Sequence, residues 1–245
     1  MKIGILGYGE IGQSLAKFYQ NKKKYTLLLK DLKFDQFGNQ KLDILNVCIP
    51  QVKNFVKIVT EVIMKNKPSL TIIHSTVLPG TTKKIIKMTR ARVVHSPIRG
   101  IHPKLYQGIK TFVKFIGCEN LKIGKIAKKH FQEIGIKKVK IIKPAVATEL
   151  NKLIDTTYYA HCIVFTDYVE KIFKKFKVPF KTFRDFNLSY NEGYKKLGKP
   201  NVIRPTLYPP SKTGGKITGH CLIPNAEILE KIFPHSITKE ILKYK

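Results

Sequence analysis

The stretch Lys2-Ile3-Gly4-Ile5-Leu6-Gly7-Tyr8-Gly9-Glu10-Ile11-Gly12 decides the fold of this chain. Its first five residues read as an apolar strand, and Ile11, Leu15 and Phe18 then recur at helical spacing. Between a strand and a helix, the first glycine of Gly-x-Gly-x-x-Gly permits a tight turn, and the second lets backbone amides approach a pyrophosphate. The third lets the helix pack on the strand. The stretch predicts a strand, turn and helix that bind a dinucleotide.

The alternation of strand and helix signals continues to about residue 143. Further strand candidates occur at residues 25–30, 42–48, 70–74, 92–95, 111–116 and 139–142. After the candidate at 42–48, apolar residues recur at i, i+3, i+4 and i+7, which indicates a helix. Such alternation is typical of a parallel sheet with helices on both faces. We therefore expect an α/β fold, a Rossmann-type doubly wound parallel sheet, as a cofactor-binding domain at residues 1–143.

The pattern changes after Pro144. No glycine or proline interrupts the chain from Ala147 to Phe176, so we expect one long connecting helix, about 45 Å in length. Shorter helices are predicted at residues 180–196, 226–232 and 238–244, with an irregular stretch rich in proline and glycine at 198–219. Residues 144–245 are therefore expected to form an all-helical dimerisation and substrate domain, with a homodimer built through the long helix.

The chain is strongly basic. Its 245 residues hold 46 Lys and Arg against 16 Asp and Glu, a formal charge of +30. Such a charge raises nucleic-acid or anionic-membrane binding as a first idea. The lysines, however, occur as scattered doublets such as Lys83-Lys84 and Lys195-Lys196, with no continuous basic arm. We interpret the charge as a solvated surface that binds nucleic acid only nonspecifically.

The cysteines and the apolar runs indicate the compartment. Cys48, Cys118, Cys162 and Cys221 have no paired spacing, which favours reduced thiols over disulfides or a zinc site. No apolar run approaches the roughly 20 residues that a membrane span needs. The first strand begins at Lys2, which leaves no room for a signal peptide. We expect a cytoplasmic protein that does not contact the membrane.

Asp31 is the candidate that selects the cofactor. It follows the second predicted strand, where a carboxylate can bond the adenosine ribose hydroxyls and repel a 2′-phosphate. This favours NAD over NADP, although Asp31 could instead be a turn residue at the end of a strand. The full set of predicted cofactor contacts is Gly7, Tyr8, Gly9, Glu10, Ile11, Gly12, Asp31, Pro50 and Thr76.

Several segments occur in the order found in one enzyme family. They are Gly7 to Gly12, Thr71-Ile72-Ile73-His74-Ser75-Thr76-Val77-Leu78-Pro79-Gly80-Thr81-Thr82, Ser96-Pro97-Ile98-Arg99, Glu149-Leu150-Asn151-Lys152-Leu153 and Gly219-His220-Cys221. In these segments, over most of its length, the chain resembles the UDP-glucose/GDP-mannose dehydrogenase family. The resemblance implies two successive NAD-dependent oxidations of a sugar's primary alcohol. A cysteine captures the aldehyde, and the resulting thioester is hydrolysed.

The resemblance assigns roles to individual residues. Cys221 would be the nucleophile, and a thiol in a glycine-rich loop of a basic protein suits that role. Lys152 would stabilise developing oxyanions, with Thr156 on the same helix face. Thr76 would lie near the nicotinamide. The alternative interpretations are that Cys221 is a packed cysteine, Lys152 a solvated lysine and Thr76 a helix-capping residue. The residues that could hold an anionic substrate are Arg99, Lys152, Arg204, Lys212, Lys216, Gly219 and His220.

The chain departs from the family pattern at three positions. Ile98 stands where the family has Glu, Asn225 where it has Asp, and Thr156 where it normally has Asn. The two carboxylates are associated with water activation and lysine positioning, so we expect slow hydrolysis of any thioester. The chain also stops at Lys245, shortly after the point where the family continues into a third, nucleotide-binding domain. We expect a partner chain to supply that wall, or a substrate smaller than a nucleotide sugar, or a lost activity.

If the chain works as this family does, NAD and Cys221 meet in a cleft between the two domains. Two further function classes stay open beside this interpretation. One is a two-electron dehydrogenase of the related β-hydroxyacid type, which uses Lys152 and leaves Cys221 incidental. The other is a noncatalytic protein that binds NAD or polyanions. His74, His95, His102 and His220 lack carboxylates at ligand-like spacing, so no metal is expected.

Overall fold

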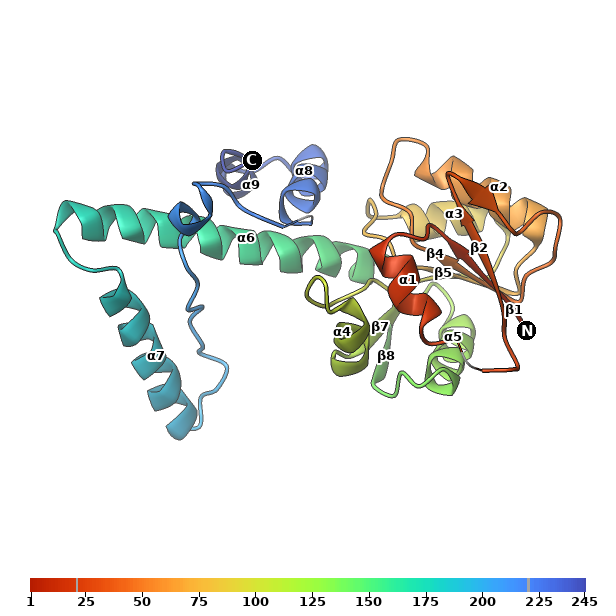
Figure 1. The fold of residues 1–245 in the computed structure, drawn as a ribbon, viewed down its shortest axis with the longest axis horizontal. Helices are drawn as coiled ribbons and strands as arrows, with labels where there is room; N and C mark the ends of the chain where they lie inside the picture. The colour runs from red at the N-terminus through yellow and green to blue at the C-terminus, as the bar shows by residue number, and fades with distance from the viewer. Residues whose placement is uncertain (21, 220) are drawn as a thin grey trace. The chain divides into compact units, whose positions relative to one another are not determined.

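One mixed sheet organises the first part of the chain in the computed structural model, which describes residues 1–20, 22–219 and 221–245 (Figure 1). In this described part the chain divides into two units, Met1–Lys152 and Leu153–Lys245. The elements of the first unit are β1 (Lys2–Leu6), α1 (Glu10–Ala16), β2 (Thr26–Asp31), β3 (Phe34–Asp35), β4 (Ile44–Val47), α2 (Phe55–Asn66), β5 (Leu70–Ile73), α3 (Thr81–Thr89), β6 (Val93–His95), α4 (Leu105–Thr111), β7 (Lys114–Gly117), α5 (Leu121–Glu133) and β8 (Val139–Ile142).

The strand order is β3-β2-β1-β4-β5-β6-β7-β8. The strands β1, β2, β4, β5 and β6 are mutually parallel, which confirms the predicted α/β fold class. The strand β3 runs antiparallel to β2, and β7 runs antiparallel to β6. The strand predicted at 111–116 was placed three residues early, because Thr111 still belongs to α4 and the apolar Phe112 and Val113 extend the pattern toward it.

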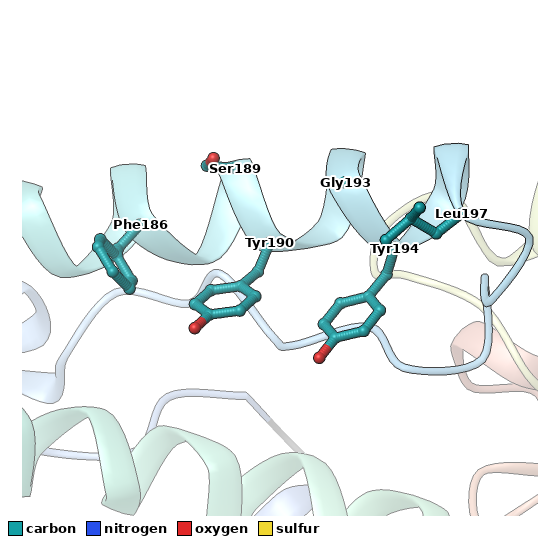
Figure 2. A pocket seen from close by; sticks show the side chains of 6 residues that line it. All are labelled: Phe186, Ser189, Tyr190, Gly193, Tyr194 and Leu197. Atoms are coloured by element: carbon teal, nitrogen blue, oxygen red, sulfur yellow. The ribbon is translucent and has the colours of Figure 1, made fainter.

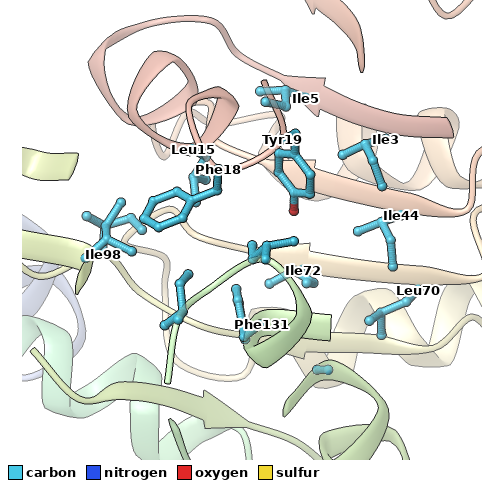
Figure 3. Close-up of a cluster of buried hydrophobic side chains, with 14 of the residues drawn as sticks. Ile3, Ile5, Leu15, Phe18, Tyr19, Ile44, Leu70, Ile72, Ile98 and Phe131 are labelled. Atoms are coloured by element: carbon cyan, nitrogen blue, oxygen red, sulfur yellow. The ribbon is translucent and has the colours of Figure 1, made fainter. Parts of the chain in front are cut away.

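A separate hydrophobic cluster covers each face of the sheet. On one face Leu15 and Phe131, from the segments of α1 and α5, pack on Ile3, Ile5 and Ile72 of the strands (Figure 3). On the other face α2 and α3 pack on alternate strand residues; this cluster includes Phe55, Val59, Ile85, Leu45 and Val47. Because successive strand residues point to opposite faces, each central strand feeds both clusters, and both faces of the sheet are buried.

The second unit is helical. It contains most of α6 (Val146–Lys175), then α7 (Lys181–Lys196), a 3₁₀ turn (Pro210–Thr213), α8 (Leu222–Ile232) and α9 (Ser236–Leu242). Its small core joins Ala160 of α6 to the pair α8 and α9, through Leu222, Ala226 and Ile241. The helix predicted from Ala226 begins four residues earlier, because a proline such as Pro224 is tolerated in a first turn.

The two units divide nine residues beyond the pattern change expected at residue 144. The first turns of α6 bond to the first unit, which explains the shift. The Thr148 hydroxyl lies 2.8 Å from Nδ1 of His95, and the Glu149 carboxylate bonds to Thr82. Among the described residues, no helix has the length and apolar character that crossing a membrane requires.

Candidate active site

The glycine turn after β1 has the geometry that its sequence predicts. Gly7 adopts φ +93°, and a Cβ there would lie 2.8 Å from the amide nitrogen of Ile49. A Cβ on Gly12 would lie 2.1 Å from the carbonyl oxygen of Gly7, so helix and turn touch at this position. A Cβ on Gly9 would meet nothing within 4 Å. Packing therefore demands the first and third glycines, whereas the middle one borders open space beside the backbone.

Asp31 is bonded to this turn. Its carboxylate accepts hydrogen bonds from the backbone N–H of Tyr8, at 2.5 Å, and of Leu32, at 2.7 Å. These bonds, that from Tyr8 first, lower the pKa of Asp31, so the group is ionised at neutral pH. Asp31 thus has the turn role that we left open. A carboxylate has about four lone-pair sites, so capacity for ribose hydroxyls also remains.

The other predicted cofactor residues surround the same turn. The strand order places β1 between β2 and β4, so successive strands are added on opposite sides of β1, and ligands bind at such a switch point in doubly wound sheets. Pro50 is exposed just after β4, and Tyr8 and Ile11 are half-buried on the turn. The Glu10 carboxylate pairs with the His102 imidazole from the loop after β6.

The segment after β5 is joined to the start of α6 by Glu149. This fully buried carboxylate accepts from the N–H of Gly80 at 2.6 Å, the N–H of Thr82 at 2.8 Å and the Thr82 hydroxyl at 2.6 Å. It therefore caps α3. Burial raises the pKa of Glu149, and the three hydrogen bonds oppose that rise. Sequence reasoning missed this cap, although both of its ends lie in segments that carry the family resemblance.

Lys152 lies one turn after Glu149 on α6 and is half-buried. The pKa of His95 is lowered to about 3, mainly by burial and in smaller part by the positive charges of Lys114 and Lys152. Lys152 is thus within electrostatic reach of the carboxyl end of β6. Thr76 is half-buried, next to Ser75, whose hydroxyl donates to the Ile49 carbonyl at 2.6 Å. The glycine turn, Asp31, Thr76 and Lys152 all belong to the first unit.

Two departures from the family pattern bond to each other in the second unit. The side-chain amide of Asn225 donates to the Thr156 hydroxyl at 3.1 Å, and both residues are buried. The Thr156 hydroxyl donates its own proton to the Leu153 carbonyl at 3.0 Å. Because a hydroxyl has one proton, this bond competes with the oxyanion contact predicted for Thr156. The third departure, Ile98, is 5% exposed and packs in the core of the first unit.

Cys221 is the N-cap residue of α8, and it is half-buried. We expected a loop at this position. The first N–H groups of a helix have no intrahelical partners, so an oxyanion formed beside this sulfur would meet backbone donors. Gly219, with φ +109°, lets the chain approach the helix. His220, a predicted substrate contact, lies outside the described residues.

The predicted anion-binding residues occupy different places. Lys212, Lys216 and Thr218 line a cavity of about 250 Å³ in the second unit, next to Gly219. The Arg204 guanidinium stacks on Tyr190 and Tyr194 of α7, at 4.1 and 5.5 Å from the ring centres. These tyrosines line a second pocket on α7, shown in Figure 2, of about 380 Å³. The structure does not bring Arg204 into the lysine cavity.

Arg99 lies in the first unit, with its guanidinium over the rings of Phe112 and Phe115, at 5.2 and 5.9 Å. It belongs to the turn after β6, near the carboxyl ends of the parallel strands. Within the described ranges, no group of three His, Cys, Asp or Glu side chains is placed to hold a metal ion.

Comparison with solved structures relates this geometry to known proteins. Over its whole length the chain superimposes on the UDP-D-ManNAc dehydrogenase of Pyrococcus horikoshii with a TM-score of 0.79, at 16% identity, and spans 68% of that chain. It has the fold of the nucleotide-sugar dehydrogenases. An NDP-N-acetyl-D-galactosaminuronic acid dehydrogenase of Methanosarcina mazei gives 0.72 at 18% identity, with 99% of this chain and 65% of that one covered.

A shorter dehydrogenase also shares the fold. The 3-hydroxyisobutyrate dehydrogenase of Mycobacterium tuberculosis gives a TM-score of 0.73 at 12% identity, with 99% of this chain and 91% of that one covered. No family model and no curated protein matches the sequence. The structural likeness predicted from the motifs is therefore confirmed at the level of the fold, and the three proteins named here are dehydrogenases.

Proposed function

We propose that this chain is an NAD-dependent oxidoreductase that oxidises the primary alcohol of an anionic sugar or nucleotide sugar, with Cys221 as nucleophile. The glycine turn carries the proposal. It combines two glycines that packing demands with a third that borders open space, beside a carboxylate at the end of β2. This is the donor and acceptor set that a dinucleotide's pyrophosphate and ribose require.

In this proposal the residues from Gly7 to Gly12 bind the pyrophosphate, and Asp31 bonds the ribose. Pro50 and Thr76 follow neighbouring strands and border the nicotinamide. NAD, when bound, supplies the hydride acceptor for the substrate carbon. The Lys152 ammonium stabilises the alkoxide that forms as the substrate hydroxyl loses its proton.

Cys221 acts on the aldehyde that the first oxidation leaves. Its thiolate adds to the carbonyl carbon, a C–S bond forms, and the carbonyl oxygen takes up a proton. That carbon then gives a second hydride to a fresh NAD while its hydroxyl loses a proton, and the product is a thioester. Water finally adds to the thioester, the C–S bond breaks, and a carboxylate and the free thiol result.

The last step is the slow one in this chain. Ile98 is buried in the core and carries no carboxylate to activate water. Asn225 stands where the family has its second carboxylate, and its side-chain amide donates a hydrogen bond to the Thr156 hydroxyl. We therefore expect the thioester to accumulate after a fast first phase of NADH formation.

The lysines of the 250 Å³ cavity support an anionic substrate, because Lys212 and Lys216 both line it. A ligand with a phosphate or carboxylate would meet two ammonium groups there. We propose that the protein acts as a homodimer, and that a partner chain supplies a further nucleotide-binding wall if the substrate is a full nucleotide sugar.

A second candidate function is a two-electron dehydrogenase of the β-hydroxyacid type that uses Lys152. The fold shared with a 3-hydroxyisobutyrate dehydrogenase, over 91% of that chain, supports this second candidate. A noncatalytic NAD-binding or polyanion-binding protein is the third. The formal charge of +30 gives it electrostatic support, and a salt titration separates specific from nonspecific binding.

The test is the number of NADH formed per sugar consumed, with a panel of nucleotide sugars and sugar phosphates. We expect two NADH in the wild type and in Cys162→Ala, whose thiol is half-buried on α6, and a loss of turnover in Cys221→Ala. One NADH that survives Cys221→Ala would establish the two-electron reaction instead. NAD binding without reduction by any substrate would contradict the enzyme proposal.

A further inference from the structure

Lys114 on β7 is a lysine inside the core of the first unit, with 4% of its surface exposed. Its Nζ lies 2.6 Å from the Ser96 carbonyl oxygen, 3.0 Å from the Pro97 carbonyl oxygen and 3.3 Å from Nδ1 of His74. An ammonium has three N–H donors and no acceptor. The three neighbours therefore satisfy the charged form of Lys114 completely.

The bond to His74 sets the donor and acceptor roles in a series of hydrogen bonds between polar side chains in the core. If Nδ1 of His74 accepts from Lys114, its Nε2 carries the proton and donates to Oδ1 of Asn46, at 3.0 Å. The Asn46 amide donates to the Tyr19 hydroxyl at 3.3 Å, and that hydroxyl donates to Nε2 of His130 at 2.8 Å. Figure 3 shows Tyr19 among the apolar side chains of this core. In each of these hydrogen bonds the donor lies on the side nearer to Lys114 and the acceptor on the farther side.

A neutral Lys114 removes this order. Nδ1 of His74 also lies 2.9 Å from the Ser96 carbonyl oxygen. A neutral amine keeps two N–H donors, enough for the Ser96 and Pro97 carbonyls, but it no longer donates to His74 and its two bonds lose their charge assistance. Nδ1 of His74 can then carry the proton and donate to the second lone pair of the Ser96 carbonyl oxygen, so the charge of Lys114 sets how strongly the turn is held.

The turn that follows β6 depends on these side-chain bonds. A single bridge, His95 opposite Gly117, pairs β6 with β7, and Pro97 has no N–H to extend the ladder. The Ser96 N–H donates to the Ile73 carbonyl on the other side, at 2.7 Å, and the bonds from the turn toward β7 come from side chains. The Ser96 hydroxyl donates to the Phe115 carbonyl at 2.6 Å, and Lys114 holds the two carbonyls on the turn.

We propose that the Lys114 ammonium is a positioning residue that fixes the turn Ser96-Pro97-Ile98-Arg99 and so presents Arg99 to an anionic substrate. The part that concerns substrate rests on the proposed function. The hold on the turn does not, because it follows from three contacts within the first unit.

The surroundings of Lys114 make its charge sensitive to pH. Burial lowers the pKa of Lys114 to about 7, and Lys152 contributes in the same direction. The titratable groups that act on Lys114 or contact it are Cys48 after β4, His74 at the end of β5, His95 on β6 and Lys152 on α6. The ring of Phe131 from α5 lies 5.5 Å away. Burial raises the pKa of Cys48 and lowers those of both histidines, so these three groups are uncharged near neutral pH.

The first test follows the turn itself by NMR, through the methyl signals of Ile98 and the amide signal of Arg99, between about pH 5.5 and 9.5. We expect these signals to shift with a midpoint near 7 in the wild type, and not to shift in Lys114→Met. The matched control is Lys140→Met, which removes an exposed lysine from the neighbouring strand β8. The control should titrate as the wild type does.

Two results would overturn the positioning role. One is a wild-type turn whose signals stay constant over this range, which needs no variant to observe. The other is a titration that persists in Lys114→Met.

The second test measures KM and kcat for UDP-glucose, or for the substrate that the NADH assay identifies, across the same pH range. Since the bonds from Lys114 to the turn weaken as the ammonium becomes neutral, KM should rise about tenfold above pH 7, the equivalent of the charge assistance of one hydrogen bond. The rise should be missing in Lys114→Met. A flat KM while the turn titrates would overturn the link to Arg99. A titrating turn in a protein that oxidises no sugar would contradict the proposed function alone.

Discussion

The helices α5 and α7 are both amphipathic and rich in lysine, but they have different surroundings. The apolar residues of α5 are mainly aliphatic, with Phe131 near its end, whereas α7 carries Phe183, Phe186, Tyr190 and Tyr194 at helical spacing. Within the described residues, α5 buries Gly124, Ala127, His130 and Phe131 against the sheet, whereas α7 buries Asn187 alone. Phe131 is fully buried (Figure 3), and Phe186 of α7 is 66% exposed (Figure 2). The first unit therefore covers its apolar helix faces from within the chain.

This difference shows what an apolar stripe does and does not predict. It predicts a helix with one face to be covered, but it does not identify the cover. The face of α7 that Figure 2 displays lines a pocket with Phe186, Tyr190, Tyr194 and Leu197. Exposed apolar patches of this kind mark interaction surfaces. The homodimer through the long helix α6 remains a prediction, and this face of α7 is a separate surface where further contacts would be sought.

Truncating the two phenylalanines gives the largest expected contrast. Phe131→Ala should lower the free energy of unfolding by about 3–5 kcal/mol, because it leaves a cavity in a packed core. Phe186→Ala should change it by less than about 0.5 kcal/mol in the monomer. Urea unfolding of both variants, at concentrations where sedimentation shows a monomer, is the measurement. A large loss for Phe186→Ala in the monomer would mean that the chain itself covers α7.

Acid should destabilise the first unit through its buried imidazoles. Burial lowers the pKa of His130 to about 4 and that of His95 to about 3, against 6.5 for a histidine in water. As the pH falls below 6.5 the unfolded chain takes up protons that the folded chain cannot, so the free energy of unfolding falls until the folded pKa is reached. For His130 alone the loss between pH 6.5 and 4 is on the order of 3 kcal/mol.

A variant isolates this contribution. His130→Gln removes the titrating group, so its stability should decline less steeply than that of the wild type over the same range. Equal slopes for the two proteins in urea titrations at successive pH values would show that His130 does not stay neutral in the fold.

The elements that the sequence predicts well are those that local chemistry determines. The turn from Gly7 to Gly12 follows from glycine geometry, and α6 differs from its predicted bounds by one residue at each end because neither glycine nor proline interrupts it. The reversal of β7 was not predictable, because period and composition do not encode the direction of a strand. Residues 111–116 were assigned to one strand because a helix end and a strand start are both apolar there.

The site was predictable where a motif is local and unpredictable where two distant segments meet. Asp31 and the glycine turn were named together, and they share a hydrogen bond. The cap that Glu149 places on α3 joins segments almost seventy positions apart, so no spacing rule finds it. Lys114 gave no signal at all, because a lysine is almost always exposed and its burial here depends on three acceptors from two other segments.

The smallest expected effect tests the pairing of Thr156 with Asn225, and the chain offers an adjacent control. Thr156→Val removes the oxygen that accepts from the Asn225 amide and leaves a buried donor unsatisfied, which should cost about 1–2 kcal/mol. Thr157 is equally buried, but among the described residues its hydroxyl has no hydrogen-bond partner. Thr157→Val keeps the shape and removes an unsatisfied oxygen, so stability should stay the same or rise. Both variants keep a β-branched side chain in α6, so helix propensity cancels between them. Equal losses in thermal unfolding of the two variants would mean that the Asn225 amide gains nothing from Thr156.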